Sequence, residues 1–158
     1  YGYRWHEDFE PPYSDFHDEA GVPGFPSEED IASIKRRYYN SVAWVDFQVK
    51  EFILELKKQG RYDDSVIIVT GDHGEEFHEN GSWFHSSSLL PAQTQVPMLI
   101  KWPKGVEAPP QASASHLDLL PSLRDLFGLP VVPGMVGRSL LKASDVERTQ
   151  RSSLVILG

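Results

Sequence analysis

The stretch from residue 65 to residue 102 constrains the fold more than any other part of this chain. An apolar run at 66–69 ends in the sequence GDHG at 71–74, and a second apolar run follows at 96–102. A short, β-branched run without polar residues is typical of a strand buried on both faces, as in the parallel sheets of α/β proteins. We therefore predict an α/β fold with the Asp-His pair at the carboxyl end of a strand, where such sheets bind ligands.

Asp72 and His73 are chemically suited to bind one divalent metal ion. An imidazole binds metal through a neutral ring nitrogen, and a carboxylate supplies a hard anionic oxygen. Neighbouring side chains on a strand point to opposite faces, so both can reach one ion only if the backbone turns here. Gly71 and Gly74 flank the pair and tolerate the positive φ of a turn. The alternative is a turn with an Asx-type hydrogen bond and a solvated histidine. Such dipeptides are common, so the surrounding residues decide between the two interpretations.

Composition excludes several classes of protein. The 158 residues fit one domain, 40% of them are hydrophobic, and the formal net charge is −8. This acidity argues against a nucleic-acid or anionic-membrane surface, and a solvated surface explains it simply. The chain has no cysteine, which excludes disulfides and thiolate metal sites. We expect no membrane span and see no signal peptide, and a chain that begins with Tyr1 is expected to be a processed or excised piece.

Helices are predicted on both sides of the central stretch. Residues 1–26 are rich in proline, aromatic and acidic residues and predict an irregular segment. Residues 27–60 predict a long helix with a serine N-cap, acids in the first turn and a glycine after the last turn. A second helix is predicted at 116–128, and the apolar run 153–157 resembles a strand. The long helix carries one apolar stripe, which comprises Ile31, Ile34, Tyr38, Val42, Val45, Val49, Phe52, Ile53 and Leu56.

Several other polar residues have both a structural and a functional interpretation. Glu75 either orients His73, supports the metal ligands from behind, or is a solvated loop acid, and Glu76 is predicted to be solvated. His78 is interpreted as part of the loop structure, and Asp46 as a surface or capping acid of the helix rather than a partner of the site. His116 is interpreted as a capping or structural histidine at the start of its helix.

Three segments in fixed order resemble the sulfatase family of the alkaline-phosphatase superfamily. They are GDHGEEFHENGSWFHSSSLLPAQTQVPMLIKWP, SHLDLLPSLRDLFGLP and GMVGRSLL, preceded by a long helix. Within the superfamily, the nearer likeness is to bacterial phosphoglycerol and phosphoethanolamine transferases. The likeness covers residues 28–141, and the order of the pieces is more specific than any single piece. It implies part of an alkaline-phosphatase-like sheet flanked by helices, with residues 1–158 as the C-terminal portion of a larger catalytic domain.

The resemblance also implies roles for individual residues. Asp72 and His73 would be metal ligands, and His85 would contact the sulfate or phosphate group, or its leaving oxygen. Glu75 would be an acid of the second shell around the metal. The family histidine is often followed by glycine, whereas Ser86 follows it here, which leaves the local turn open.

The implied function is a metal-dependent sulfuric- or phosphoric-ester hydrolase or transferase. The family nucleophile, a Ser, Thr, Cys or formylglycine, would precede Tyr1, so the chain alone is expected to be inactive. No cysteine is present to become formylglycine, and no lysine occurs between Lys58 and Lys101, where many sulfatases carry one. The missing lysine favours phosphoester chemistry or a divergent sulfatase. The alternative is a non-catalytic binding or structural module derived from the same fold.

The implied cofactor is one or two divalent metal ions. A histidine ligand favours Mn or Zn, because Ca prefers a shell of oxygens, and Ca or Mg would fit if the whole enzyme is a sulfatase. The expected partners are a sulfate- or phosphate-ester substrate and the rest of the same polypeptide, upstream and also downstream. Nucleic acid is not an expected partner. The resemblance further implies an exported, periplasmic or membrane-anchored location.

Overall fold

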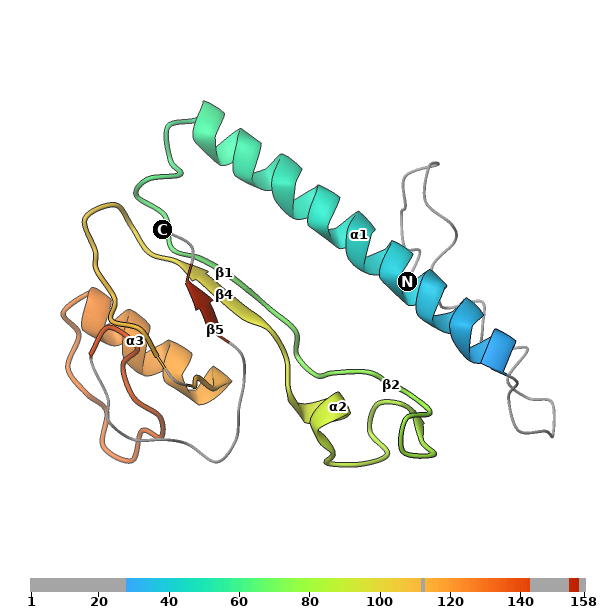
Figure 1. The fold of residues 1–158 in the computed structure, drawn as a ribbon. Helices are drawn as coiled ribbons and strands as arrows, with labels where there is room; N and C mark the ends of the chain where they lie inside the picture. Colours follow the sequence, from blue (N-terminus) through green and yellow to red (C-terminus); the bar gives the residue numbers. More distant parts are fainter. Residues whose placement is uncertain (1–27, 112, 143–153, 157–158) are drawn as a thin grey trace. The chain divides into compact units, whose positions relative to one another are not determined.

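A computed structural model describes residues 28–111, 113–142 and 154–156 of the chain (Figure 1). The predicted irregular segment 1–26 and the ends of the predicted strand 153–157 lie outside the described residues.

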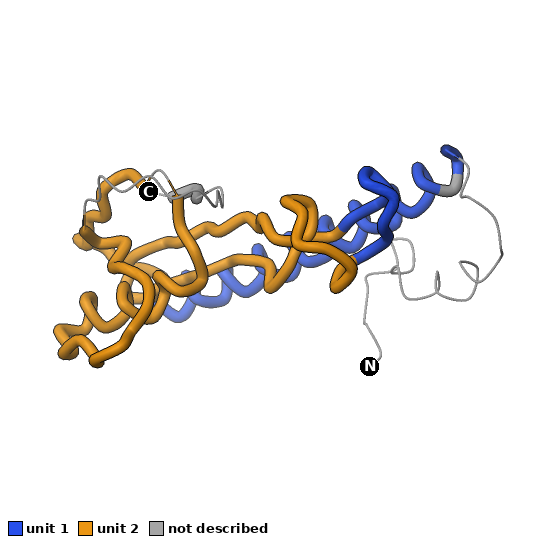
Figure 2. The backbone as a smooth tube through the Cα atoms, turned by 90° about the horizontal axis from the view of Figure 1, so that it is seen from below, with its two compact units in different colours: residues 1–61, 76–84 blue, residues 62–75, 85–158 orange. Residues whose placement is uncertain are grey.

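The chain divides into two compact units, which Figure 2 shows in different colours. Unit 1 is Tyr1–Arg61 with Glu76–Phe84, and unit 2 is Tyr62–Glu75 with His85–Gly158. All four residues that the sequence assigns to the site therefore belong to unit 2.

Unit 1 is built on one long helix, α1 (Glu28–Lys58), in the region where the sequence predicts it. Two lysines lie in its last turn, where positive charge complements the helix dipole. Gly60 then adopts φ +67°, and the amide of Arg61 donates to the carbonyl of Leu56 at 2.9 Å, which closes the helix end. The other elements among the described residues of unit 1 are the strands β2 (Glu76–Phe77) and β3 (Trp83–Phe84), which pair antiparallel.

The contacts between α1 and this hairpin lie in the first half of the helix. The Tyr38 and Phe77 rings meet edge-on with centroids 4.9 Å apart, and Ile34 is buried. Further along the predicted apolar stripe, Val45 and Phe52 are 56% and 59% exposed. Among the described residues of unit 1, the hairpin is too short to cover the whole stripe. Asp46 is also exposed, in agreement with its interpretation as a surface acid.

Unit 2 contains a three-stranded sheet in the order β1-β4-β5, which are Ile67–Thr70, Met98–Lys101 and Leu154–Ile156. β4 and β5 are parallel, but β1 pairs antiparallel with β4, with Thr70 opposite Met98. The expectation that the first apolar run lies in a parallel sheet is therefore wrong for β1. The run is also half-buried rather than fully buried, because β1 is an edge strand of the described sheet.

The core of unit 2 lies on one face of β4. Met98 and Ile100 alternate with less buried residues along the strand, so both point to the same side. They form a cluster with Trp102, Ala114 and Leu140, and partly buried residues of the helix α3 (Leu119–Leu126) pack against it.

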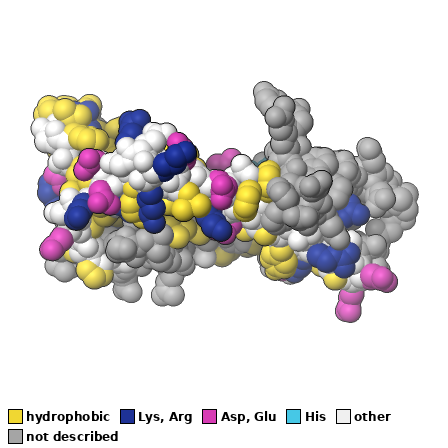
Figure 3. Space-filling view, turned by 90° about the horizontal axis from the view of Figure 1, so that it is seen from above, with side chains coloured by type: hydrophobic (Ala, Val, Ile, Leu, Met, Phe, Trp, Pro, Cys, Tyr) yellow, Lys and Arg dark blue, Asp and Glu magenta, His cyan; other side chains and the backbone are white. Residues whose placement is uncertain are grey.

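On the face drawn in Figure 3, lysine and arginine side chains are interspersed with acidic and hydrophobic ones rather than gathered in one patch.

Asp118 connects the start of α3 to the turn that follows it. It ends the short 3-10 helix η2 (His116–Asp118), and its carboxylate accepts the amides of Ser115 and Arg138, both at 2.9 Å. The Ser115 hydroxyl caps the same turn in a reciprocal capping box. Ser122 donates to the Asp118 carbonyl and accepts the Leu140 amide, so these buried groups are mutually satisfied. These hydrogen bonds connect the segment SHLDLLPSLRDLFGLP to the segment GMVGRSLL, the two downstream pieces of the sequence pattern.

None of the helices among the described residues has the length and apolar character that a bilayer crossing requires.

Candidate active site

Two glycines shape the turn after β1 by permitting close backbone contacts. A Cβ atom on Gly74 would lie 2.1 Å from the carbonyl oxygen of Ala92, and the Gly74 amide donates to the Gln93 carbonyl at 2.8 Å. A Cβ on Gly71 would lie 3.2 Å from the His73 carbonyl oxygen. Neither Gly71 nor Gly74 has a positive φ, so the predicted reason for these glycines is wrong. The turn is needed, but close packing against the short helix α2 (Pro91–Thr94) imposes it.

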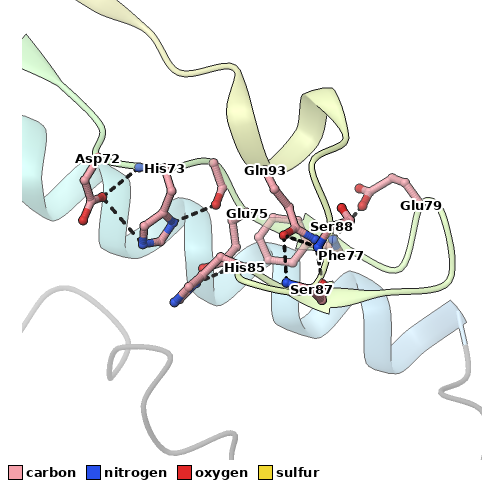
Figure 4. Close-up of polar contacts among 10 residues, drawn as sticks. Asp72, His73, Glu75, Phe77, Glu79, His85, Ser87, Ser88 and Gln93 are labelled. Atoms are coloured by element: carbon pink, nitrogen blue, oxygen red, sulfur yellow. Dashed lines mark hydrogen bonds and ion pairs between the residues drawn. The ribbon is translucent and has the colours of Figure 1, made fainter. Parts of the chain in front are cut away.

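Asp72 and His73 present two metal-binding atoms on the same side of this turn (Figure 4). The Asp72 Oδ1 atom accepts the His73 amide at 3.0 Å and lies 3.6 Å from His73 Nε2. His73 Nδ1 lies 2.9 Å from the Gly74 carbonyl oxygen, which can only accept. Nδ1 therefore donates to this carbonyl, and Nε2 is the ring nitrogen on the side of Asp72.

The spacing of these two atoms fits one shared ion. Ligand atoms bound to one divalent ion at about 2.0–2.2 Å are about 3.0–3.6 Å apart for octahedral to tetrahedral angles. Backbone hydrogen bonds from its own amide and from His73 hold the pKa of Asp72 below its usual range, with the charge of the two nearby imidazoles acting in the same sense. The carboxylate is thus ionised at neutral pH. Within the described ranges, no three acidic or histidine residues together form a metal-binding group.

His85 lies beside this pair and directly follows β3. Its ring centroid is 3.9 Å from that of His73, with 32° between the ring planes. Its Nδ1 atom lies 3.1 Å from Glu75 Oε1 (Figure 4). Glu75 thus contacts His85 and not His73, the histidine that the sequence analysis expected it to orient. Glu76 is fully buried and accepts an amide hydrogen bond, so the prediction that it is solvated is wrong.

Gln93 is a site residue that the sequence analysis did not identify. Its buried side chain accepts the amides of Ser87 and Ser88 at 3.2 and 3.1 Å and donates to the Ser87 hydroxyl at 2.8 Å. Its own carbonyl accepts the Gly74 amide. One residue therefore holds both the turn that carries Asp72 and the loop that follows His85. The available signal was the amide-rich sequence PAQTQ before the second apolar run.

Two further predicted residues have structural positions. His116 Nε2 lies 3.0 Å from Thr70 Oγ1, at the end of β1, while the N-cap of η2 is Ser115. His116 is thus a structural link between η2 and the site strand and not a cap. His78 has φ +71° and stacks on Trp83 with centroids 5.2 Å apart, in agreement with a role in the loop structure.

The backbone at Ser86 predicts a stabilising substitution. Ser86 has φ +65°, a conformation that costs a non-glycine residue about 1–2 kcal/mol and that explains why glycine suits this position. We expect Ser86→Gly to raise the free energy of unfolding by about 0.5–1 kcal/mol, since glycine also loses more chain entropy. Urea unfolding measures this change. Ser41→Gly, in the middle of α1, is the control and should destabilise the protein. A destabilising Ser86→Gly would contradict the strain.

Comparisons with known proteins agree on one family. The family model described as Sulfatase matches residues 3–129. Arylsulfatase K of Bos taurus is 35% identical over 120 residues, which are 75% of this chain and 22% of that protein. Choline-sulfatase of Rhizobium meliloti (strain 1021) is 31% identical over 128 residues, 78% of this chain and 25% of that protein. The chain thus spans about a quarter or less of the length of these relatives.

A solved structure shows the same fold. It is BT4656 in complex with its substrate D-glucosamine-2-N,6-O-disulfate, with a TM-score of 0.63 and 24% identity over 81% of this chain and 27% of that one. The predicted α/β fold is confirmed by this likeness. The relatives named above are sulfatases, and the nearer likeness to phosphoglycerol and phosphoethanolamine transferases stays a prediction.

Proposed function

Because this chain belongs to the sulfatase family, we propose that it is the part of a sulfuric-ester hydrolase that carries two metal ligands and the leaving-group acid. The observation that supports this proposal is the cluster of Asp72, His73 and His85. His73 Nε2 faces Asp72 Oδ1 at 3.6 Å, and the His85 ring lies against the His73 ring. A purely structural module has no need to bring a carboxylate and two imidazoles together from two separate segments of the chain.

Asp72 and His73 would hold a divalent ion together with ligands from outside the described residues. When bound, such an ion supplies Lewis-acid stabilisation of the charged sulfate oxygens. The imidazole donor favours Mn or Zn, with Ca or Mg as the alternatives. Sites with useful affinity generally have at least three protein ligands, so the two residues of this turn are an incomplete set.

His85 would assist the departure of the alcohol. As the bond between sulfur and the leaving oxygen breaks, its electron pair stays on that oxygen, and a proton from His85 Nε2 neutralises the charge. The new bond to sulfur forms from a nucleophilic hydroxyl oxygen that the rest of the protein supplies. Histidine suits this role because its pKa lies near neutrality.

Phosphate esters are the second candidate substrate, and the observation that favours them is the absence of lysine between Lys58 and Lys101. The resemblance makes this informative, because many sulfatases carry a lysine in this loop. Against this stands the identity of the relatives, which are named as sulfatases. We therefore place sulfate esters first.

The two candidates are distinguished by comparing 4-nitrophenyl sulfate with 4-nitrophenyl phosphate, using the full-length protein. We expect kcat/KM to be at least about tenfold higher for the sulfate, a difference of about 1.4 kcal/mol in transition-state stabilisation. Activity should disappear with a chelator and return with one of Mn, Zn, Ca or Mg. The opposite preference would assign phosphoester chemistry. Failure to hydrolyse either ester with any of these ions would favour the non-catalytic module.

A further inference from the structure

We propose that Glu75 is the positioning residue of His85: its carboxylate fixes the imidazole so that Nε2 faces the leaving oxygen. The contact on which this depends is the 3.1 Å approach of Glu75 Oε1 to His85 Nδ1. A carboxylate at neutral pH can only accept, so His85 Nδ1 donates and its second nitrogen points away from Glu75 (Figure 4). This inference rests on the proposed function, because it assigns a task to the proposed acid.

The two side chains differ in how firmly their surroundings hold them. The Glu75 side chain is 11% exposed, whereas that of His85 is 44% exposed. A nearly buried side chain has few accessible rotamers, because the atoms packed around it leave little free space. The more exposed imidazole has fewer constraints of its own. Glu75 is therefore the fixed member of the pair, and His85 is the member that is being oriented.

The backbone segments that carry Glu75 and His85 are both hydrogen-bonded to Gln93. Glu75 directly follows Gly74, whose amide is bound to the Gln93 carbonyl at 2.8 Å. His85 precedes Ser87 and Ser88, whose amides are bound to the Gln93 side chain. Gln93 therefore fixes the separation of the two segments through hydrogen bonds that do not involve the Glu75–His85 contact. This arrangement keeps the carboxylate within reach of the ring.

The orientation matters because an imidazole has two nitrogens, and only the protonated ring carries a proton on both. A carboxylate that accepts from Nδ1 fixes the ring so that the Nε2–H of the protonated imidazole faces the leaving oxygen, as acceptors on Nδ1 orient histidines in metal sites. The benefit depends on the leaving group. A nitrophenolate departs readily without a proton, whereas an alkoxide is a strong base that needs one. Loss of a correctly placed acid should therefore harm alkyl esters far more than nitrophenyl esters.

The test measures kcat and KM of the full-length protein on two substrates, 4-nitrophenyl sulfate and a primary alkyl sulfate. We expect Glu75→Ala to lower kcat for the alkyl sulfate about 100-fold, with less than about a fivefold loss on the nitrophenyl ester and little change in KM. Glu75→Gln keeps an oxygen acceptor at the same place and should retain kcat to within about fivefold. Glu107→Ala removes an exposed charge of the same kind and should leave both activities unchanged.

A second variant keeps the inference testable if Glu75→Ala does not fold. Glu75→Asp retains the charge but withdraws the carboxylate by one methylene, and it should show the same selective loss on the alkyl sulfate. Equal losses on both esters, a raised KM with unchanged kcat, or a Gln variant as poor as the Ala variant would each overturn the role of Glu75. Wild-type protein inactive on both sulfates would overturn the proposed function and this inference with it.

Discussion

Replacing Asp72 with alanine should lower kcat/KM for sulfate-ester hydrolysis by about a thousandfold and abolish metal-dependent stabilisation of the protein. Asp72 Oδ1 and His73 Nε2 are 3.6 Å apart, a separation that fits one ion, and the carboxylate is the anionic member of the pair. Lewis-acid stabilisation is worth several kcal/mol, and about 4 kcal/mol corresponds to this loss in rate. The side chain itself is 89% exposed, so its removal leaves no cavity.

The measurement joins kinetics to metal binding. Metal content per protein and the rise in Tm on adding Mn or Zn are determined for the wild type and for Asp72→Ala. The matched control is Asp64→Ala, which removes an exposed aspartate from the link before β1 and should keep both the activity and the rise in Tm. If Asp72→Ala still shows the metal-dependent rise in Tm, Asp72 is not a ligand.

Local sequence patterns were sufficient for the features that depend on near neighbours. The first-turn acids, the three-and-four spacing of apolar residues and Gly60 place the helix at 27–60, and the structure has α1 at Glu28–Lys58. The change from an apolar run to GDHG likewise places the Asp-His turn at the end of β1. Each of these signals acts within one or two turns of chain, where spacing alone determines which side chains meet.

Features that depend on contacts between residues far apart in the chain could not be predicted from local sequence patterns. The role of Gln93 arises because α2 brings its side chain back to residues 87 and 88 and its carbonyl to Gly74. Glu76 is fully buried and pairs with Phe84 in the hairpin, whereas the sequence around it resembles a polar loop. The antiparallel pairing of β1 depends on which strand lies next to it, and an apolar run contains no information about its neighbour's direction.

The same distant packing predicts that Gly74→Ala will destabilise the protein by about 3 kcal/mol. Its Cβ would lie 2.1 Å from the Ala92 carbonyl oxygen, a backbone atom that cannot rotate away. Relief requires α2 to move, which costs the Gly74 to Gln93 hydrogen bond, about 1 kcal/mol, and about 1–3 kcal/mol for overpacking. Urea unfolding measures the loss as a lower midpoint with an unchanged slope.

Gly105→Ala is the matched control, because it isolates the effect of backbone conformation from that of crowding. Gly105 also lies in unit 2 and has φ +84°, but a Cβ there would meet nothing within 4 Å. Its substitution should cost only the left-handed strain, about 1 kcal/mol. Gly74→Ala should also impair alkyl-sulfate hydrolysis in the protein that remains folded, since the displaced turn carries Glu75 away from His85. Equal losses of stability for the two variants would show that α2 does not constrain the turn.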